Sequence, residues 1–262
     1  MRKELKKTII LQGTEQGTER KEDTIVNEFH LAIFVNKQLI ATLTCSPAKL
    51  DYLTTGFLFS EGLINGKEDI NGLIIDQHEG VAKVKTEQGK NKGEAQTVRR
   101  LIISGGGKSC FTEPYYNQSR QGSNSQIKIS ITEIFALMDE FIQLSKIFQD
   151  TGGVHSAALC DKNGILLFSE DIGRHNAIDK IFGECILKGI KTNERVILTS
   201  GRVSSEIVHK VLKGNVPLLI SKSAPTDMGI QLAEEFGITL IGFARGRRMN
   251  IYSQGWRVVN AA

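Results

Sequence analysis

The strongest constraint in this sequence is an alternation of helical and strand patterns along residues 176–243. The helical periods cover residues 176–188, 205–212 and 227–236, and the short apolar runs between and after them cover residues 196–199, 216–220 and 238–243. Short apolar runs separated by helices are typical of βαβ units that build a parallel sheet. The pattern therefore predicts an α/β fold for this part of the chain.

Polar loops follow three of the expected strands, at residues 200–205, 221–226 and 244–248. In such sheets the loops that leave the carboxyl ends of the strands meet at one edge, and ligands bind there. The basic residues that these loops would gather are Arg202, Lys222, Arg245, Arg247 and Arg248. Together with serines and helix N-termini they suit a phosphate or pyrophosphate ligand, although a solvated turn is the plain alternative for any one of them.

The first part of the chain predicts an α+β arrangement. Apolar and polar residues alternate over residues 28–44, as expected of two paired strands with a turn at Asn36 and Lys37. Ser46 and Pro47 then supply an N-cap and a first-turn proline for a helix.

Two stretches of the first part are polar. Residues 12–23 are expected to be frayed, because they contain few apolar side chains. Residues 76–100 are rich in Lys, Gly and Gln and contain one short alternation, which predicts an exposed hairpin.

A domain boundary is expected near residue 126. Ser130 and Glu133 form a capping box, and a helical apolar stripe follows over residues 134–148. We therefore predict an N-terminal α+β domain at residues 1–126 and a C-terminal α/β domain at residues 127–262.

Composition and charge exclude several classes of protein. The chain has 262 residues and a formal net charge of +4, too small by itself to indicate nucleic-acid binding. Its four cysteines form no C-x-x-C pair, which argues against a disulfide scaffold and a structural zinc cluster. No run of about 18 apolar residues and no signal-peptide core occurs. We expect a cytoplasmic protein with neither a nucleic-acid nor a membrane partner.

A glycine-rich run, SGGGKS at residues 104–109, precedes Cys110. A phosphate-binding P-loop needs G-x-x-x-x-G-K-[ST], and Ile102 stands where the first glycine belongs, so nucleotide hydrolysis is not expected. The glycines instead provide flexible backbone around Cys110, and Lys108 favours its thiolate. Cys110 is the candidate reactive thiol. The other three cysteines are expected to be small buried residues: Cys45, Cys160 and Cys185.

Two histidines lie in polar motifs that interrupt apolar sequence. For His155 the plain interpretation is a structural, hydrogen-bonding residue. His175 lies at a strand-to-helix junction together with Glu170 and Asp171, a place where loops carry chemistry, and proton handling is one hypothesis for these residues. A zinc deaminase would need H-x-E and P-C-x-x-C, and neither occurs, so no metal site is predicted.

Several motifs, taken together, closely resemble the FdhD family, the formate dehydrogenase accessory sulfurtransferases. The motifs are LTTGFLFSEGL at residues 53–63, TGGVHSAA at 151–158, SEDIGRHNAIDK at 169–180, TSGR at 199–202, SAP at 223–225 and GFARGRRMN at 242–250. The resemblance covers the chain from roughly residue 25 to residue 255.

The resemblance implies a cytoplasmic sulfur carrier. Such a protein takes persulfide sulfur from a cysteine desulfurase and passes it to the molybdenum cofactor, bis-molybdopterin guanine dinucleotide, before the cofactor is inserted into formate dehydrogenase. By the match to the family's loop, Cys110 would bear the persulfide, although many members carry C-x-x-C there and this chain has Cys110 alone. The family's guanine dinucleotide site falls on Phe243, Ala244, Arg245, Gly246, Arg247 and Arg248.

The resemblance also has structural implications. The second domain is expected to be similar to the cytidine deaminase fold without its zinc, and the protein is expected to form a homodimer. Two other functions stay open at this point: a cofactor-binding chaperone of formate dehydrogenase that moves no sulfur, and a nucleotide-dependent enzyme that uses the glycine-rich run.

Overall fold

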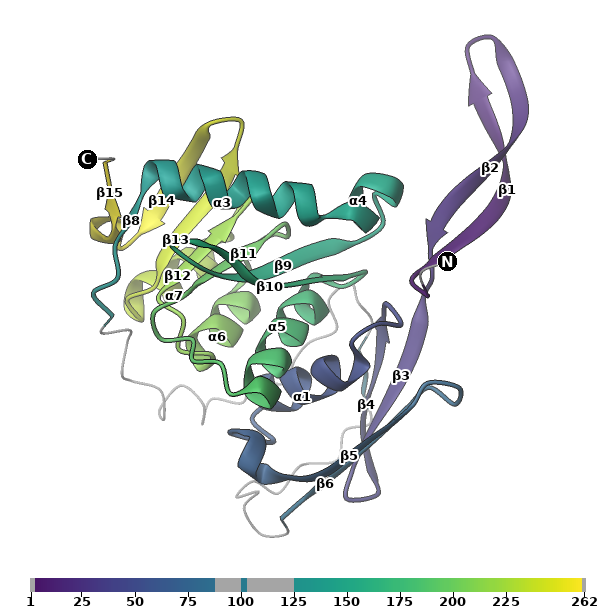
Figure 1. Ribbon diagram of the computed structural model, residues 1–262, viewed down its shortest axis with the longest axis horizontal. Coiled ribbons are helices and arrows are strands. Elements are labelled where there is room, and N and C mark those ends of the chain that lie inside the picture. The colour runs from purple at the N-terminus through teal and green to yellow at the C-terminus, as the bar shows by residue number, and fades with distance from the viewer. Residues whose placement is uncertain (1–2, 88–99, 103–124, 261–262) are drawn as a thin grey trace.

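The computed structural model describes residues 3–87, 100–102 and 125–260. These residues form a mixed α/β structure with a six-stranded sheet, a five-stranded sheet and a projecting two-stranded arm (Figure 1). No described helix has the length and apolar character needed to cross a membrane. The domain boundary near residue 126 stays a prediction.

The six-stranded sheet has the strand order β10-β9-β11-β12-β13-β14. Its strands are β9 (His155–Asp161), β10 (Gly164–Asp171), β11 (Val196–Thr199), β12 (Leu218–Ser221), β13 (Thr239–Arg245) and β14 (Arg248–Ser253). The central strands β11, β12 and β13 are parallel, as the βαβ pattern predicts, whereas the flanking strands pair antiparallel. The carboxyl ends of the three parallel strands therefore share one edge with the start of β9.

Helices cover both faces of this sheet (Figure 1). One face carries α3 (Ile131–Leu144) and α4 (Lys146–Thr151), and the other carries α5 (Arg174–Lys188), α6 (Ser205–Lys213) and α7 (Asp227–Glu235). The predicted capping box is confirmed: the Glu133 backbone N–H donates to Ser130 Oγ at 3.2 Å, and the Ser130 N–H donates to Glu133 Oε2 at 2.7 Å. The bond from the Ser130 N–H stabilises the Glu133 carboxylate and lowers its pKa.

The five-stranded sheet has the order β5-β6-β3-β4-β7. Its strands are β3 (Phe29–Val35), β4 (Gln38–Cys45), β5 (Ile70–Asp76), β6 (Val81–Thr86) and β7 (Arg100–Ile102). The predicted turn between β3 and β4 is confirmed, because Asn36 and Lys37 both have positive φ, at 47° and 72°. The hairpin expected within residues 76–100 is only partly right, since β6 pairs with β5, which precedes residue 77.

Helix α1 (Leu50–Ser60) begins later than the sequence predicts. Its N-cap is Lys49 in the left-handed region at φ 54°, without a side-chain capping bond. Ser46 instead forms hydrogen bonds with residues at the end of β10. Its N–H donates to Asp171 Oδ2 at 3.0 Å, and its Oγ accepts from the N–H of Ile172 at 3.2 Å. The prediction of a cap at Ser46 is wrong, because Ser46 binds Asp171 and Ile172, which are distant in the sequence, and does not bind the first turn of α1.

Helices α1 and α5 cross closely and join the two halves. A Cβ built on Gly56 would lie 1.8 Å from the backbone oxygen of Asp179, and one on Gly183 would lie 1.9 Å from that of Tyr52. Ser60 Oγ donates to Asp179 Oδ1 at 2.6 Å across the same contact. Only glycine permits backbones to approach this closely, so the crossing depends on both glycines.

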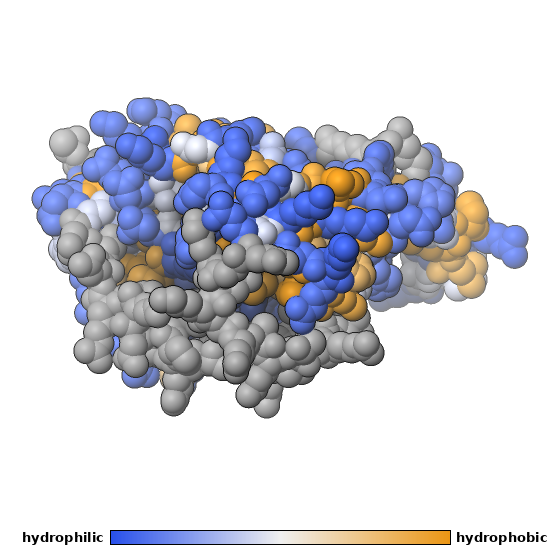
Figure 2. All heavy atoms as spheres, turned by 90° about the horizontal axis from the view of Figure 1, so that it is seen from below, coloured by the Kyte–Doolittle hydropathy of each residue, from blue (hydrophilic) through white to orange (hydrophobic). Residues whose placement is uncertain are grey.

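An arm of two antiparallel strands, β1 (Leu5–Thr14) and β2 (Gly17–Val26), projects from the body (Figure 1). The expectation that residues 12–23 are frayed is wrong, because ten residue pairs continue the ladder to the turn. Strand β1 contains β-favouring residues, whereas β2 is mostly polar and by its composition does not look like a strand. Figure 2 shows apolar side chains gathered at this end of the molecule, where Ile9, Leu11 and Ile25 are exposed.

Short elements complete the described fold. Strands β8 (Ile129–Ser130) and β15 (Val258–Val259) pair in parallel, and η1 (Lys67–Asp69) and η2 (Gly255–Arg257) are single 3₁₀ turns. Arg257 is buried near these elements, and its guanidinium donates to the backbone oxygens of Gly237 and Ser125.

Candidate functional site

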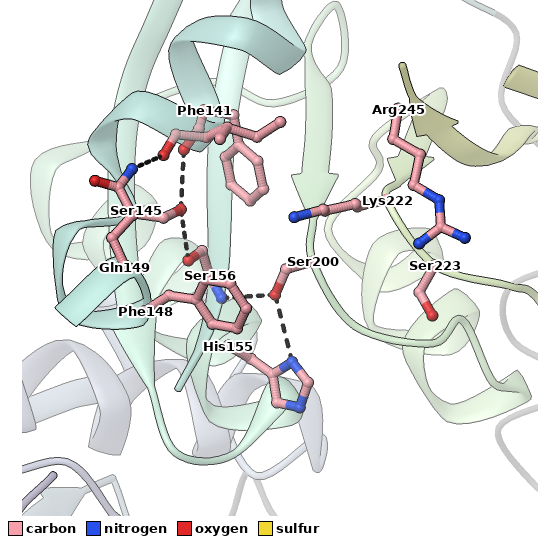
Figure 3. A pocket seen from close by; sticks show the side chains of 11 residues that line it. Phe141, Ser145, Phe148, Gln149, His155, Ser156, Ser200, Lys222, Ser223 and Arg245 are labelled. Carbon is pink, nitrogen blue, oxygen red and sulfur yellow. Dashed lines mark hydrogen bonds between the residues drawn. The ribbon is translucent and has the colours of Figure 1, made fainter. Parts of the chain in front are cut away.

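A pocket of about 460 Å³ lies at the edge of the six-stranded sheet where the parallel strands end. Three loops contribute to it: Ser200 follows β11, Lys222 and Ser223 follow β12, and Arg245 ends β13. His155 enters from the first position of the antiparallel strand β9. The sequence prediction that these loops meet at one edge is confirmed. Figure 3 shows their side chains around the opening.

The opposite wall comes from the helices that cover this face of the sheet. Its residues are Phe141, Ile142, Ser145, Phe148 and Gln149, from α3, α4 and the junction between them. The apolar periodicity of α3 places Phe141 in the core, whereas Phe148 is 40% exposed and presents its ring to the opening. The apolar periodicity of residues 134–148 does not show that Phe148, the last residue of the pattern, lines a pocket. The sequence analysis therefore did not predict this wall of the pocket.

A chain of hydroxyl groups holds the pocket floor in place. Ser145 Oγ donates to the Phe141 carbonyl at 2.9 Å and lies 2.9 Å from Ser156 Oγ. Ser200 Oγ accepts from the Ser156 N–H at 2.9 Å. These bonds connect α3, β9 and the loop after β11, so they fix the relative positions of the two walls.

The surroundings of His155 disfavour its protonated form. Burial lowers the pKa of its imidazole, and the charges of Arg174, Arg202 and His175 lower it further. His155 Nδ1 lies 3.3 Å from Ser200 Oγ, whose hydroxyl proton it can accept. His155 thus has the hydrogen-bonding role expected from its sequence context, and it does so at the mouth of a pocket.

The pocket is cationic. Lys222 Nζ lies 5.5 Å from the centroid of the Phe148 ring, and the Arg245 guanidinium lies 5.9 Å from that of Phe243. Among the described residues that line the pocket there is no carboxylate. Two cations beside aromatic faces, hydroxyls and an amide favour an anionic ligand with a planar ring.

The structure distributes residues 243–248 over two environments. Phe243, at φ 53°, donates its N–H to the Ser223 carbonyl at 3.0 Å, which ties the end of β13 to the loop after β12. Ala244 is buried in the core, and Arg245 lines the pocket. This segment therefore reaches the pocket through one side chain, that of Arg245.

The remaining three residues form the turn that leads into β14. Gly246 and Arg247 have positive φ, at 58° and 61°. Arg247 lies 3.0 Å from Asp139 and is exposed, and Arg248 is exposed at the start of β14. Arg247 and Arg248 do not line the pocket in the described structure. The side chains of the segment point to different surfaces because a tight turn separates them.

The predicted sulfur-bearing residue, Cys110, lies outside the described residues, as do Lys108 and the glycine-rich run. The other cysteines are buried, as expected. Burial raises the pKa of Cys45 and of Cys185 to about 12 in each case, and it also raises the pKa of Cys160. None of these three thiols is an accessible thiolate at neutral pH.

The charged residues at the strand-to-helix junction have structural contacts. Asp171 is fully buried and lies 2.6 Å from Lys180. The Glu170 carboxylate accepts from the backbone N–H groups of Ile147 and Phe148 at 3.3 and 3.0 Å. Glu170 therefore positions the start of α4 and the Phe148 ring. The hypothesis that these acids move protons stays a prediction.

Comparisons with known proteins agree with this architecture. The model of the FdhD/NarQ family matches residues 26–259. The chain belongs to the FdhD/NarQ family. Within that family it is 42% identical over 248 residues to the sulfur carrier protein FdhD of Bacillus subtilis (strain 168), covering 93% of this chain and 94% of that protein. It is also 42% identical over 245 residues to the sulfur carrier protein FdhD of Listeria innocua, covering 91% and 93%.

A solved structure shows the same fold. It is the crystal structure of a protein from Desulfotalea psychrophila that is assigned as a formate dehydrogenase accessory protein. The two structures superpose with a TM-score of 0.78 at 23% sequence identity, over 97% of this chain and 98% of that one. The mixed α/β architecture of this FdhD/NarQ member is therefore shared along nearly its whole length.

Proposed function

We propose that this chain is a sulfur carrier that accepts persulfide sulfur from a cysteine desulfurase and delivers it to the molybdenum cofactor before insertion into formate dehydrogenase. Its relatives named as sulfur carrier proteins and its fold neighbour assigned as a formate dehydrogenase accessory protein support this role. The observation that carries the proposal is the pocket, in which Lys222 and Arg245 stand without a lining carboxylate among the described residues.

The pocket suits a guanine dinucleotide, the nucleotide part of bis-molybdopterin guanine dinucleotide. Its volume of about 460 Å³ falls within the range of small-molecule sites. Lys222 and Arg245 would bind phosphate groups, and the exposed ring of Phe148 would contact the base. Gln149 offers an amide that can both donate to and accept from a base edge. Phe243, Ala244, Gly246, Arg247 and Arg248 stay part of the proposed cofactor site.

The proposed chemistry needs one accessible thiolate. The Cys110 thiolate attacks the outer sulfur of the desulfurase persulfide, a new S–S bond forms, and the old S–S bond breaks. The desulfurase cysteine leaves as a thiolate, so the exchange needs no oxidant or reductant. Lys108 would favour the attacking thiolate. Cys45, Cys160 and Cys185 do not suit this step, because burial raises the pKa of each thiol.

The test is an intact-mass measurement after incubation with a cysteine desulfurase and cysteine. We expect the chain to gain one sulfur atom, and we expect dithiothreitol to remove it. Cys110→Ala should show no gain, whereas the control Cys185→Ala should still gain the sulfur. A reducible adduct that persists in Cys110→Ala would assign the carrier role to another residue.

A chaperone that binds the cofactor without moving sulfur is the second candidate function. It is favoured by the pocket itself, whose described lining contains no cysteine. The two functions separate in a strain that lacks the gene for this protein. A sulfur carrier with Cys110→Ala fails to restore formate dehydrogenase activity, whereas a chaperone restores it. Arg245→Gln impairs both.

Four further expectations belong to the same proposal. We propose that residues 127–262 have a cytidine deaminase-like fold without zinc. We also propose a cytoplasmic location, a homodimer, and direct contacts with the desulfurase and formate dehydrogenase. Sedimentation of the full chain, alone and with each partner, tests the dimer and both complexes.

A further inference from the structure

Two arginine side chains, one from α5 and one from the loop after β11, meet near His155 beside the pocket. Arg174 is the first residue of α5, and Arg202 belongs to the loop after β11. Burial is the main cause that lowers the pKa of both His155 and Arg174, and the nearby Arg202 charge lowers both further. We call His155, Arg174 and Arg202 the arginine cluster.

Neither arginine forms an ion pair with a carboxylate of the described residues, although the charge of Glu206 partly offsets the causes that lower the pKa of Arg174. Asp171 acts electrostatically on His155, and Glu206 acts on Arg174. Each of these carboxylates has an ion-pair partner of its own: Asp171 lies 2.6 Å from Lys180, and Glu206 lies 3.0 Å from His175. Within residues 3–87, 100–102 and 125–260, no carboxylate lies within 4.0 Å of Arg174 or Arg202. Two like charges held together are unfavourable unless an anion lies between them.

Arg174 also has an unsatisfied hydrogen-bond donor. Its Nε is buried and has no hydrogen-bond partner among the described residues. A buried N–H without an acceptor costs free energy, so such a group in a folded protein needs an explanation. An oxyanion beside Arg174 would accept from this donor and compensate the charge at the same time.

The local backbone is built to hold Arg174 in this place. Gly201 has no side chain where Arg174 passes, and a Cβ there would lie 2.8 Å from Arg174 Cβ and 3.1 Å from its Cδ. The turn before α5 is fixed by Asp171 Oδ1, which accepts from the Gly173 N–H at 2.9 Å. The positive end of α5, a helix of 15 residues, adds to the field at the same point.

We propose that Arg174 and Arg202 bind a phosphate-type oxyanion in a subsite that adjoins the pocket through His155 and Ser200. The proposed function bears on this subsite in one respect only, namely which molecule supplies the oxyanion. The oxyanion is either a phosphate group of the nucleotide whose other end lies against Lys222 and Arg245, or a separate small oxyanion. Guanidinium groups suit both, because their paired N–H donors match two oxygens of one anion.

The first experiment titrates inorganic phosphate into the full chain and follows the His155 imidazole by NMR. Bound phosphate should raise the pKa of His155, because it offsets the two arginine charges. Arg202→Gln, an exposed loop variant, and Arg174→Gln should each weaken phosphate binding about tenfold or more, the loss expected for a charge-assisted hydrogen bond. The control Lys83→Gln removes an exposed charge from the five-stranded sheet and should leave binding unchanged.

Two outcomes would overturn the subsite. One is phosphate binding of unchanged strength in both arginine variants. The other is phosphate binding that Arg245→Gln abolishes and Arg202→Gln leaves intact, since the anion would then lie in the pocket. Circular dichroism shows whether Arg174→Gln folds. If Arg174→Gln does not fold, the phosphate affinity of Arg202→Gln decides the result.

The second experiment repeats the titration with saturating guanosine diphosphate. If phosphate still binds, the subsite takes a separate oxyanion. If guanosine diphosphate excludes phosphate and is itself weakened by Arg202→Gln, its own phosphate occupies the subsite. Loss of guanosine diphosphate binding in Arg245→Gln, together with phosphate binding that Arg174→Gln and Arg202→Gln leave unchanged, would keep the proposed cofactor pocket and overturn the subsite. Phosphate binding that depends on Arg202 in a chain that binds no nucleotide would keep the subsite and overturn the proposed cofactor.

Discussion

Lys222 and Arg245 are the two cations that line the pocket, and they come from loops more than twenty residues apart in the sequence. We expect Lys222→Gln and Arg245→Gln each to weaken guanosine diphosphate binding about tenfold or more, because each removes a charge-assisted contact to phosphate. Arg247→Gln should have a smaller effect, since Arg247 is exposed and paired with Asp139. Isothermal titration calorimetry at two salt concentrations measures these differences.

The control for this prediction is Lys83→Gln, which lowers the net charge equally but lies in β6 of the five-stranded sheet, a sheet that contributes no residue to the pocket lining. Its affinity should equal that of the unmodified chain. Raising the salt concentration should weaken binding in the unmodified chain more than in Arg245→Gln. Equal affinities for Arg245→Gln and Lys83→Gln would place the nucleotide elsewhere.

Cysteine reactivity gives a second test at the scale of single residues. The raised pKa values of Cys45, Cys160 and Cys185 mean that these thiols stay protonated in the folded protein at pH 8, whereas unfolded thiols with a pKa near 8.5 are partly ionised. We expect Ellman's reagent at pH 8 to modify one thiol rapidly in the native chain and four in urea. Native Cys110→Ala should show no rapid phase.

The sign of the accompanying pH effect follows from the same pKa values. A thiol with a raised folded-state pKa contributes stability that is complete below the unfolded pKa and declines as the pH rises toward the folded value. For Cys45 and Cys185 this decline falls between about pH 9 and about pH 12. Rapid modification of two or more thiols in the native chain at pH 8 would contradict the burial of these cysteines.

At the scale of elements, the contact between α1 and α5 depends on Gly56 and Gly183. Alanine in an ordinary helix position stabilises by about 1 kcal/mol relative to glycine. Here we expect Gly56→Ala and Gly183→Ala each to lower the free energy of unfolding by about 3 kcal/mol, because the added Cβ would overlap backbone atoms that cannot move independently. Urea denaturation measures the change.

The matched control is Gly72→Ala in β5, where the nearest atom to a new Cβ is 3.9 Å away. This variant should change the free energy of unfolding by less than about 1 kcal/mol. If Gly56→Ala is as stable as Gly72→Ala, the helices do not cross as closely as described.

Local and long-range interactions explain which elements could be predicted. Ser130 and Glu133 begin a helix as the sequence predicts, since a capping box is complete within four residues. Ser46 has the same local appearance, but Asp171, 125 residues away, binds its N–H. The arm of β1 and β2 was missed for a related reason, because the composition of one strand does not reveal the pairing that stabilises it.

At the scale of the whole molecule, buried polar contacts connect the two sheets through α1 and α5. Asp171 binds both Ser46 and the fully buried Lys180, and Asp179 binds both Ser60 and Lys210. Breaking such a pair leaves a buried charge uncompensated, at a cost of about 3 to 5 kcal/mol. The two cores are therefore expected to unfold together.

Hydrogen exchange in increasing urea tests this expectation. Amides of β3 in the five-stranded sheet and of β11 in the six-stranded sheet should open with the same free energy and the same dependence on urea. In Gly56→Ala the five-stranded sheet should open first. Separate opening of the two sheets in the unmodified chain would show that the helix contact does not couple them.

The sequence by itself determined the alternation of helices and strands after residue 130, the convergence of three polar loops and the burial of three cysteines. These features depend on periodicity and on neighbours within a few residues, which hydrophobic burial and local hydrogen bonds enforce. Tertiary structure alone decided that Phe148 faces the pocket, that Arg245 reaches it while Arg247 does not, and that Arg174 lies beside Arg202. Those placements depend on contacts between side chains that are distant in the sequence. No local sequence pattern specifies where two such side chains will meet.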